Sequence, residues 1–88
     1  MIYQIDFSEK AKADIAFFQK SGNLPVLKKI SALIKEIAQH PFTGTGKPEQ
    51  LKYRLSGNWS RRINHEDRLV YEIEKDKILI HSLRGHYS

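Results

Sequence analysis

The apolar side chains change their spacing near the middle of the chain. Before residue 41 they recur every three or four positions, as on one face of a helix, in two stripes: Ala11, Ile15 and Phe18, then Leu27, Ile30, Ile34 and Ile37. From residue 52 onward the spacing falls to about two, which is typical of strands. Helices first and strands second favour an α+β fold, in which a two-helix hairpin packs on one face of an antiparallel sheet.

Residues that start and stop helices divide the first half. Ile2–Asp6 alternates weakly and predicts a short N-terminal strand. Ser8 can cap a helix that runs to about Lys20. Pro25 suits the first turn of a second helix, which should stop near His40 because the residue before a proline disfavours helical backbone angles. Polar side chains should lie outside on this second helix: Lys28, Lys29, Lys35 and Glu36.

The second half predicts four strands joined by short turns. Their expected ranges are Lys52–Leu55, Asn58–Asn64, Arg68–Glu74 and Lys77–Arg84. With 88 residues, of which 40% are hydrophobic, the chain has enough apolar side chains for one modest core, so residues 1–88 are expected to form a single domain.

A three-residue turn at His65-Glu66-Asp67 would pair Ile63 with Leu69 and Arg61 with Tyr71. Because opposed residues share a face, Arg62 and Arg68 should then lie together on the opposite face with Val70. Arginine binds phosphate groups through two parallel hydrogen bonds, so this pair suggests a phosphate site. The alternative is that nearby glutamates neutralise both arginines in ordinary surface ion pairs.

Charge narrows the kind of partner. Fifteen basic residues against ten acidic ones give a net charge of +5, and every arginine lies at or after Arg54. This favours an anionic partner, nucleic acid before membrane, although a basic excess that only confers solubility explains the number equally well. No apolar run approaches the roughly 20 residues that span a bilayer, and no signal peptide is visible, so we expect a cytoplasmic protein that does not bind membranes.

Strand directions bring several polar residues to one end of the predicted sheet. The set expected there is Glu49, Lys52, Arg62, Arg68, Arg84, His86 and Tyr87. A carboxylate, an imidazole and several arginines can move protons and bind a phosphate, which is the chemistry of metal-free RNA cleavage. The chain has no cysteine and its histidines are poorly spaced for a metal, so no metal or cofactor is expected. The Gly44-Thr45-Gly46-Lys47 segment lacks the spacing of a nucleotide-binding phosphate loop.

Four segments of the chain then form a recognisable combination: Phe42–Lys52 with its Gly-Lys-Pro-Glu block, Leu55–Ile63 with Ser-Gly-Asn-Trp-Ser-Arg-Arg, His65–Tyr71, and the terminal His86-Tyr87. Together they resemble the Txe/YoeB family of bacterial toxins, which belongs to the RelE-like superfamily of toxin–antitoxin systems. The resemblance covers the whole chain. It implies a small α+β fold like that of microbial ribonucleases.

The resemblance also implies an activity. Such toxins are mRNA endonucleases that act mainly in the ribosomal A site without a metal. By motif position, Glu49 resembles the general base, His86 the general acid, and Arg68 the arginine that stabilises the scissile phosphate. Lys52, Arg62 and Tyr87 resemble supporting residues. Since Arg61 points away from Arg62, we expect it to make rim, ribosome or structural contacts, and Arg84 to support RNA binding.

The implied partners are the ribosome with its mRNA and a cognate antitoxin, whose acidic segment would cover the basic surface. Operator DNA would be reached only through the antitoxin complex. A homodimer would suit so small a domain, although no residue pattern specifies one. A different class of function is a basic module that blocks translation or another nucleic-acid machine without cutting, since fold alone does not decide function.

Overall fold

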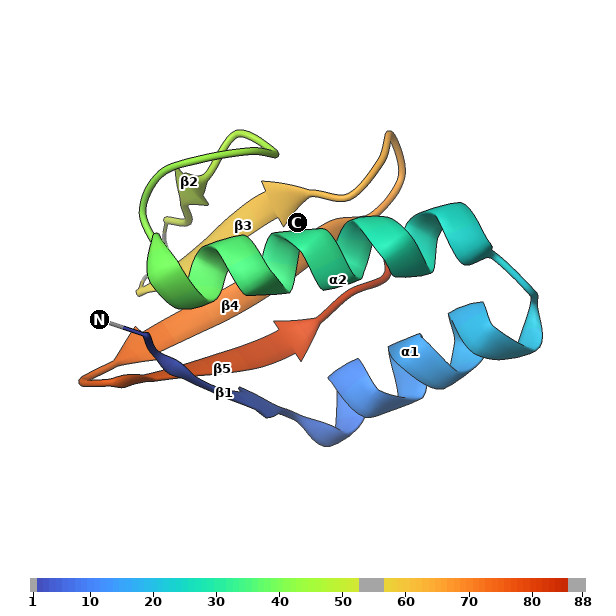
Figure 1. Cartoon of the computed structure of the whole chain (residues 1–88), viewed down its shortest axis with the longest axis horizontal. Helices are drawn as coiled ribbons and strands as arrows, with labels where there is room; N and C mark the ends of the chain where they lie inside the picture. Colours follow the sequence, from blue (N-terminus) through green and yellow to red (C-terminus); the bar gives the residue numbers. More distant parts are fainter. Residues whose placement is uncertain (1, 53–56, 86–88) are drawn as a thin grey trace.

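A computed structural model describes residues 2–52 and 57–85 of the chain (Figure 1). Its elements follow in the order β1 (Gln4–Phe7), α1 (Glu9–Lys20), α2 (Leu24–Gln39), β2 (Glu49–Gln50), β3 (Asn58–Arg62), β4 (Arg68–Glu74) and β5 (Lys77–Ser82). In Figure 1, α2 crosses in front of β3 and β4, and α1 lies beside it. The predicted α+β fold, with a helical hairpin on one face of a sheet, is confirmed.

The sheet is mixed rather than wholly antiparallel. Its strand order is β1-β5-β4-β3-β2, and β1 runs parallel to β5, while the other neighbours are antiparallel. Parallel neighbours need a long crossover, and here the crossover contains everything between the first strand and the last. The expected antiparallel pairing is present among β2 to β5, whereas the parallel place of the N-terminal strand beside β5 was not predicted.

Both helices begin where the sequence predicts. The Ser8 hydroxyl caps α1 by accepting a hydrogen bond from the Ala11 N–H at 3.1 Å. The Asn23 side chain caps α2 by accepting from the Val26 N–H at 3.3 Å, with a proline in the first turn. Helix α2 ends at Gln39, immediately before His40, as the following proline requires.

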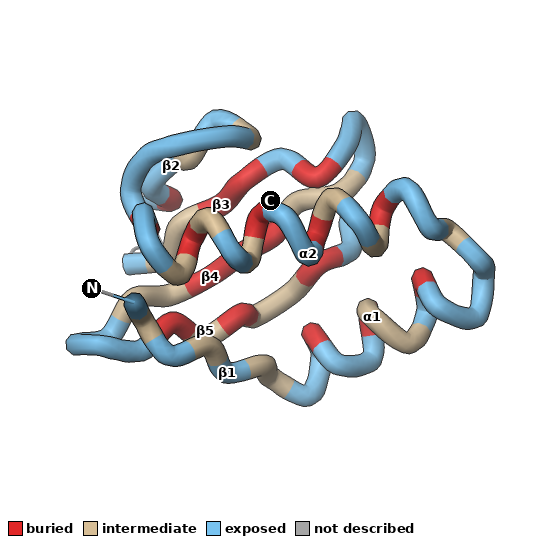
Figure 2. Tube along the Cα trace, in the orientation of Figure 1, coloured by how far each residue is buried: buried red, intermediate tan, exposed pale blue. Residues whose placement is uncertain are grey.

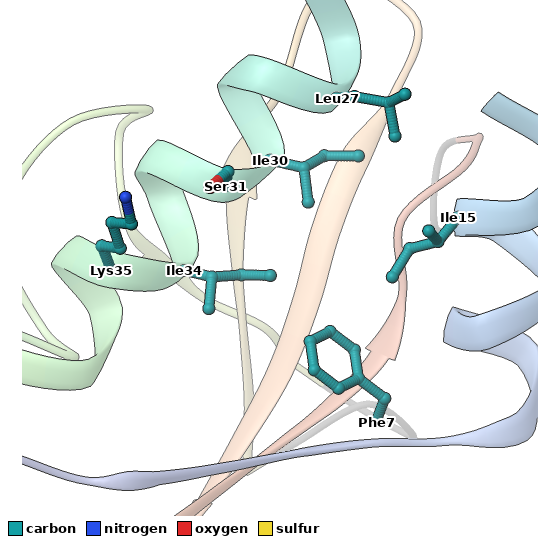
Figure 3. Close-up of a pocket in the computed structure, with 7 residues that line it drawn as sticks. All are labelled: Phe7, Ile15, Leu27, Ile30, Ser31, Ile34 and Lys35. Carbon is teal, nitrogen blue, oxygen red and sulfur yellow. The ribbon is translucent and has the colours of Figure 1, made fainter. Parts of the chain in front are cut away.

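The core lies between the helices and the central strands, where Figure 2 shows the buried positions. Of the predicted stripes, Ala11, Phe18, Ile30 and Ile37 are buried. The rest of the stripes, Ile15, Leu27 and Ile34, are only partly buried and line an apolar groove of about 350 Å³ between the helices, together with Phe7 (Figure 3). Val26 and Leu33 are buried on α2 instead, because the apolar stripe of a core-facing helix is wider than one row of side chains.

The register of β3 against β4 differs from the prediction by two residues. Arg61 lies opposite Leu69 and Arg62 opposite Arg68, so the connection is longer than three residues. The Asn64 side-chain oxygen holds this turn by accepting from the N–H groups of Glu66 at 2.8 Å and Asp67 at 2.7 Å. A shift of two leaves every side chain on its predicted face, so Arg62 and Arg68 still share a face.

Several strand boundaries also differ: the N-terminal strand is Gln4–Phe7 instead of Ile2–Asp6, and β3 ends at Arg62 instead of Asn64. Pairing with β3 occurs at Glu49–Gln50, ahead of the expected strand Lys52–Leu55, of which residues 53–55 lie outside the described part. Strand β5 ends at Ser82, two residues before Arg84, after a register irregularity opposite Val70 and Tyr71.

Candidate active site

Strand pairing brings Glu49, Arg62 and Arg68 to one end of the sheet. Glu49 lies opposite Ser60, two positions along β3 from Arg62, and Arg62 lies opposite Arg68. Side chains alternate along strands, so these residues belong to the face opposite the helices, because Arg61 between them points towards α2. Glu49 and Arg62 are exposed and Arg68 is half-buried. The site is therefore open to a large ligand.

The end of β5 continues to this place. The Arg68 N–H donates to the Gly85 carbonyl at 3.1 Å, and the Gly85 N–H donates to the Asp67 carboxylate at 2.8 Å. The Arg68 guanidinium donates in turn to the Asn64 carbonyl at 2.8 Å. Gly85 directly precedes His86, which lies with Tyr87 outside the described residues.

The other two residues of the predicted set lie apart from this arginine pair. Lys52 follows Leu51, whose N–H donates to the Asn58 carbonyl at 2.9 Å, so its backbone lies at the far end of β3 from Arg62. The reason is that pairing in β2 begins three residues earlier than expected. The Arg84 guanidinium stacks on the Phe17 ring of α1, 3.5 Å from its centroid.

Arg61 is fully buried, although its neighbour Arg62 is exposed. Its guanidinium forms an ion pair with the Glu36 carboxylate on α2. It also donates to the carbonyls of His40, Thr43 at 2.9 Å and Thr45 at 3.3 Å. The sequence left three kinds of contact open for Arg61: rim, ribosome or structural. In the structure its contacts are structural.

Tyr71 completes this buried cluster. Its hydroxyl accepts from the Arg61 Nε–H at 3.2 Å and donates to the Pro41 carbonyl at 2.6 Å. Burial raises the pKa of Tyr71, and the adjacent Arg61 opposes that rise. The phenol therefore stays protonated and keeps both hydrogen bonds at neutral pH.

Glu36 is held in its ionised form. The Thr45 backbone N–H, the Thr45 hydroxyl and Arg61 all lower the pKa of this carboxyl group, and together they outweigh the opposing effect of burial. Glu36 is partly exposed, in keeping with its expected place outside the apolar stripe of α2, but its contacts with Thr45 and Arg61 were not predicted. The available signal was Arg61 itself, because an arginine in register with apolar core residues needs a carboxylate or carbonyl partner for its charge.

The Gly-Thr-Gly segment has a structural explanation in the same cluster. Gly44 has φ +126°, and a Cβ there would lie 2.2 Å from the Glu36 carboxylate oxygen. Gly46 has φ +84°, and a Cβ there would lie 2.9 Å from the Arg62 carbonyl. These glycines let the loop pack against the Arg61–Glu36 pair.

A second buried charge was also missed. Asp14 on α1 accepts from the Leu83 N–H at 2.9 Å and pairs with Lys10 at 3.0 Å. It sits in the helical stripe between Ala11 and Phe18, where only apolar residues were expected to face the core. Its role is to satisfy the backbone at the end of β5.

Neither a cluster of metal-ligating side chains nor a membrane-spanning helix is found in the part of the chain that the structure describes. No group of three metal-ligating side chains occurs within residues 2–52 and 57–85. In the same ranges, no helix is long and apolar enough to cross a membrane.

Comparison with known proteins adds the family. The model of the YoeB-like toxin of bacterial type II toxin–antitoxin systems matches residues 7–87. A toxin YoeB from Synechocystis is 52% identical over 84 residues, which cover 96% of each chain. A YoeB/ParE toxin from Agrobacterium tumefaciens has a TM-score of 0.91 at 34% identity, covering 96% of this chain and 99% of that one.

Two structures from Staphylococcus aureus are similar too. One is a YoeB dimer, 43% identical, and one is a YoeB–YefM complex, 44% identical. Each has a TM-score of 0.86 and covers 99% of this chain and 100% of its own. Family model, sequence identity and fold agree over nearly the whole chain, and on these findings the chain belongs to the YoeB-like toxins of bacterial type II toxin–antitoxin systems.

Proposed function

We propose that this toxin is a ribosome-dependent mRNA endoribonuclease that cuts mRNA in the A site and so inhibits translation. The observation that carries the proposal is the meeting of Glu49, Arg62 and Arg68 at one exposed sheet end, where Gly85 leads the chain towards His86. This set supplies a carboxylate and two cations, and the segment that follows supplies an imidazole. Family membership supports the same activity.

The reaction needs no group beyond these side chains. Glu49 accepts the proton of the ribose 2′-hydroxyl, whose oxygen attacks the adjacent phosphorus. The bond from phosphorus to the 5′-oxygen breaks, and His86 gives that oxygen a proton. The products are a 2′,3′-cyclic phosphate and a 5′-hydroxyl end. Arg68 and Arg62 offset the charge that builds up on the phosphate oxygens in the transition state.

The remaining residues support binding. We assign Tyr87 to the RNA near the scissile phosphate, and Lys52 and Arg84 to more distant phosphates on either side of it. Arg61 has no such contact, because its guanidinium is enclosed by protein. Arg61 supports the site by holding the fold around it.

The partners follow from the same surface. A cognate antitoxin would cover the basic residues with an acidic segment, as a toxin of the same family is complexed with YefM in Staphylococcus aureus. Operator DNA would be contacted through that antitoxin. A homodimer is proposed by analogy with the Staphylococcus aureus dimer. Because the toxin would act on ribosomes, we assign it to the cytoplasm, and no membrane contact is proposed.

Primer extension in a defined translation reaction tests this function. We expect new mRNA 5′ ends within the A-site codon, only when ribosomes are present. Glu49→Gln removes the base while keeping the shape of the side chain, so the cleavage rate should fall by about 10²–10⁴-fold. The matched control is Glu74→Gln at the exposed end of β4, which should cleave like the wild type. Stalled but uncut mRNA with the wild-type protein would instead establish a binding module that blocks translation.

A further inference from the structure

The position of Glu49 depends on the loop that precedes it. This loop, residues 40–48, joins α2 to β2, and β2 itself is only two residues long. Two paired residues in an edge strand provide little restraint of their own. What fixes the loop therefore also contributes to the position of Glu49.

Three side chains, of which Arg61 and Tyr71 are buried, hold residues 40–45 of the loop. Arg61 binds the carbonyls of His40, Thr43 and Thr45, and the Tyr71 hydroxyl donates to the carbonyl of Pro41. Glu36 accepts from both the Thr45 N–H and, at 3.0 Å, the Thr45 hydroxyl. We call Glu36, Arg61 and Tyr71 the loop clamp.

The clamp is tied directly to the strand that carries the arginine site. The Arg62 N–H donates to the Gly46 carbonyl at 2.7 Å, and Gly46 lies three residues before Glu49. Arg61 and Arg62 are adjacent, so one residue of β3 holds the loop while the next presents a guanidinium on the opposite face. The same short strand, β3, therefore sets the positions of both the loop and Arg62.

We propose that the loop clamp positions Glu49 relative to Arg62 and Arg68, so that Glu36, Arg61 and Tyr71 are positioning residues for the cleavage reaction without touching RNA. This inference rests on the proposed nuclease function. A base displaced by about 1 Å from its productive geometry loses roughly a hundredfold in rate, so holding this loop is a requirement of the chemistry and not only of stability.

The chain contains its own reporter of loop position. Trp59 is the single tryptophan, and its ring packs edge-on against Phe42 of the loop with centroids 5.2 Å apart. Release of the loop would separate Phe42 from Trp59 and expose the indole to water. Tryptophan fluorescence therefore follows the loop without any nuclease assay.

The test uses two mild changes in the clamp. Glu36→Gln removes the charge that pairs with Arg61, and Tyr71→Phe removes only the hydroxyl that joins Arg61 to the loop. Their matched controls are Glu74→Gln on the exposed end of β4 and Tyr3→Phe in the partly buried N-terminal segment. Each variant is examined by circular dichroism, by acrylamide quenching of Trp59 and by single-turnover cleavage on programmed ribosomes.

For both clamp variants we expect native circular dichroism and stronger quenching of Trp59. The single-turnover cleavage rate should fall at least tenfold while the concentration for half-maximal rate stays within twofold. The two controls should match the wild type in every measurement. A lower rate with unchanged binding is expected of a misplaced base. A weakened fold would instead lower the folded fraction, which circular dichroism would show.

Several results would overturn the positioning role. One is a clamp variant with increased Trp59 quenching that cleaves at the wild-type rate, and another is a slowed variant whose quenching is unchanged. A loss of ribosome affinity with an unchanged rate would also contradict it. A wild-type protein that never cuts mRNA would overturn the proposed nuclease function itself. An active wild type with clamp variants that cleave equally fast would overturn only the positioning role.

Discussion

Arg61 and Arg62 are neighbours on one strand, yet they belong to two different regions of the molecule. Arg61 lies on the helix-covered face, where its guanidinium is enclosed by a carboxylate and backbone carbonyls. Arg62 lies on the opposite face, exposed and beside Arg68. Two adjacent arginines look like one basic patch in the sequence. Because side chains alternate along a strand, one of them is structural here and the other is available for binding.

The strongest test of this division removes each charge separately. Arg61→Met would remove the cation that pairs with Glu36 and would leave the loop carbonyls of His40 and Thr43 without this donor, so we expect a decrease of about 3 kcal/mol or more in the free energy of unfolding. Arg62→Met removes an exposed charge and should change stability by less than about 0.5 kcal/mol. Urea unfolding followed by circular dichroism measures both, and equal decreases would abolish the distinction.

The opposite pattern should appear in binding to ribosomes. Removing one cation that binds a phosphate reduces the slope of log affinity against log salt by about 0.7–0.9. Between 50 and 200 mM salt, the affinity of Arg62→Gln should therefore fall about threefold less than that of the wild type. Sedimentation with ribosomes at several salt concentrations measures these slopes. An unchanged slope for Arg62→Gln would show that this guanidinium meets no phosphate.

The smallest expected effect is a pH dependence of stability that comes from Glu36, the partner of Arg61. The folded-state pKa of Glu36 is lowered below 4.5 by Thr45 and Arg61, so its contribution to stability is present above 4.5 and is lost as pH falls through the lower folded value. Glu36→Gln should therefore be less stable than the wild type near neutral pH, and the gap should narrow in acid. Thermal unfolding from pH 7 to pH 3 measures this gap. If the difference in stability between the wild type and Glu36→Gln stayed constant across that range, the charge of Glu36 would not contribute to stability.

The helices were predictable because local signals decide them. Ser8 and Pro25 act within one turn of their own positions, and their effects appear in the structure as expected. The face shared by Arg62 and Arg68 was predictable for a similar reason, since alternation survives a register shift of two residues. Local periodicity was enough for both.

The contacts of Glu36 were not predictable from such signals. On the helix its position indicates the outer face, and only the path of the loop, fixed by Arg61 on a distant strand, brings partners to its carboxylate. The parallel pairing of β1 depends likewise on residues more than 70 positions away. Long-range pairings of this kind are set by tertiary packing and leave no local pattern.

The parallel pairing also bears on how the toxin is made. Strand β1 is synthesised first, but its neighbour in the described sheet is β5, which is formed by residues 77–82. A nascent chain that has not yet released those residues from the ribosomal exit tunnel therefore lacks the strand that joins β1 to β4. The Arg68–Gly85 contact forms later still. The order of strands thus postpones completion of the sheet until nearly the whole chain has left the exit tunnel.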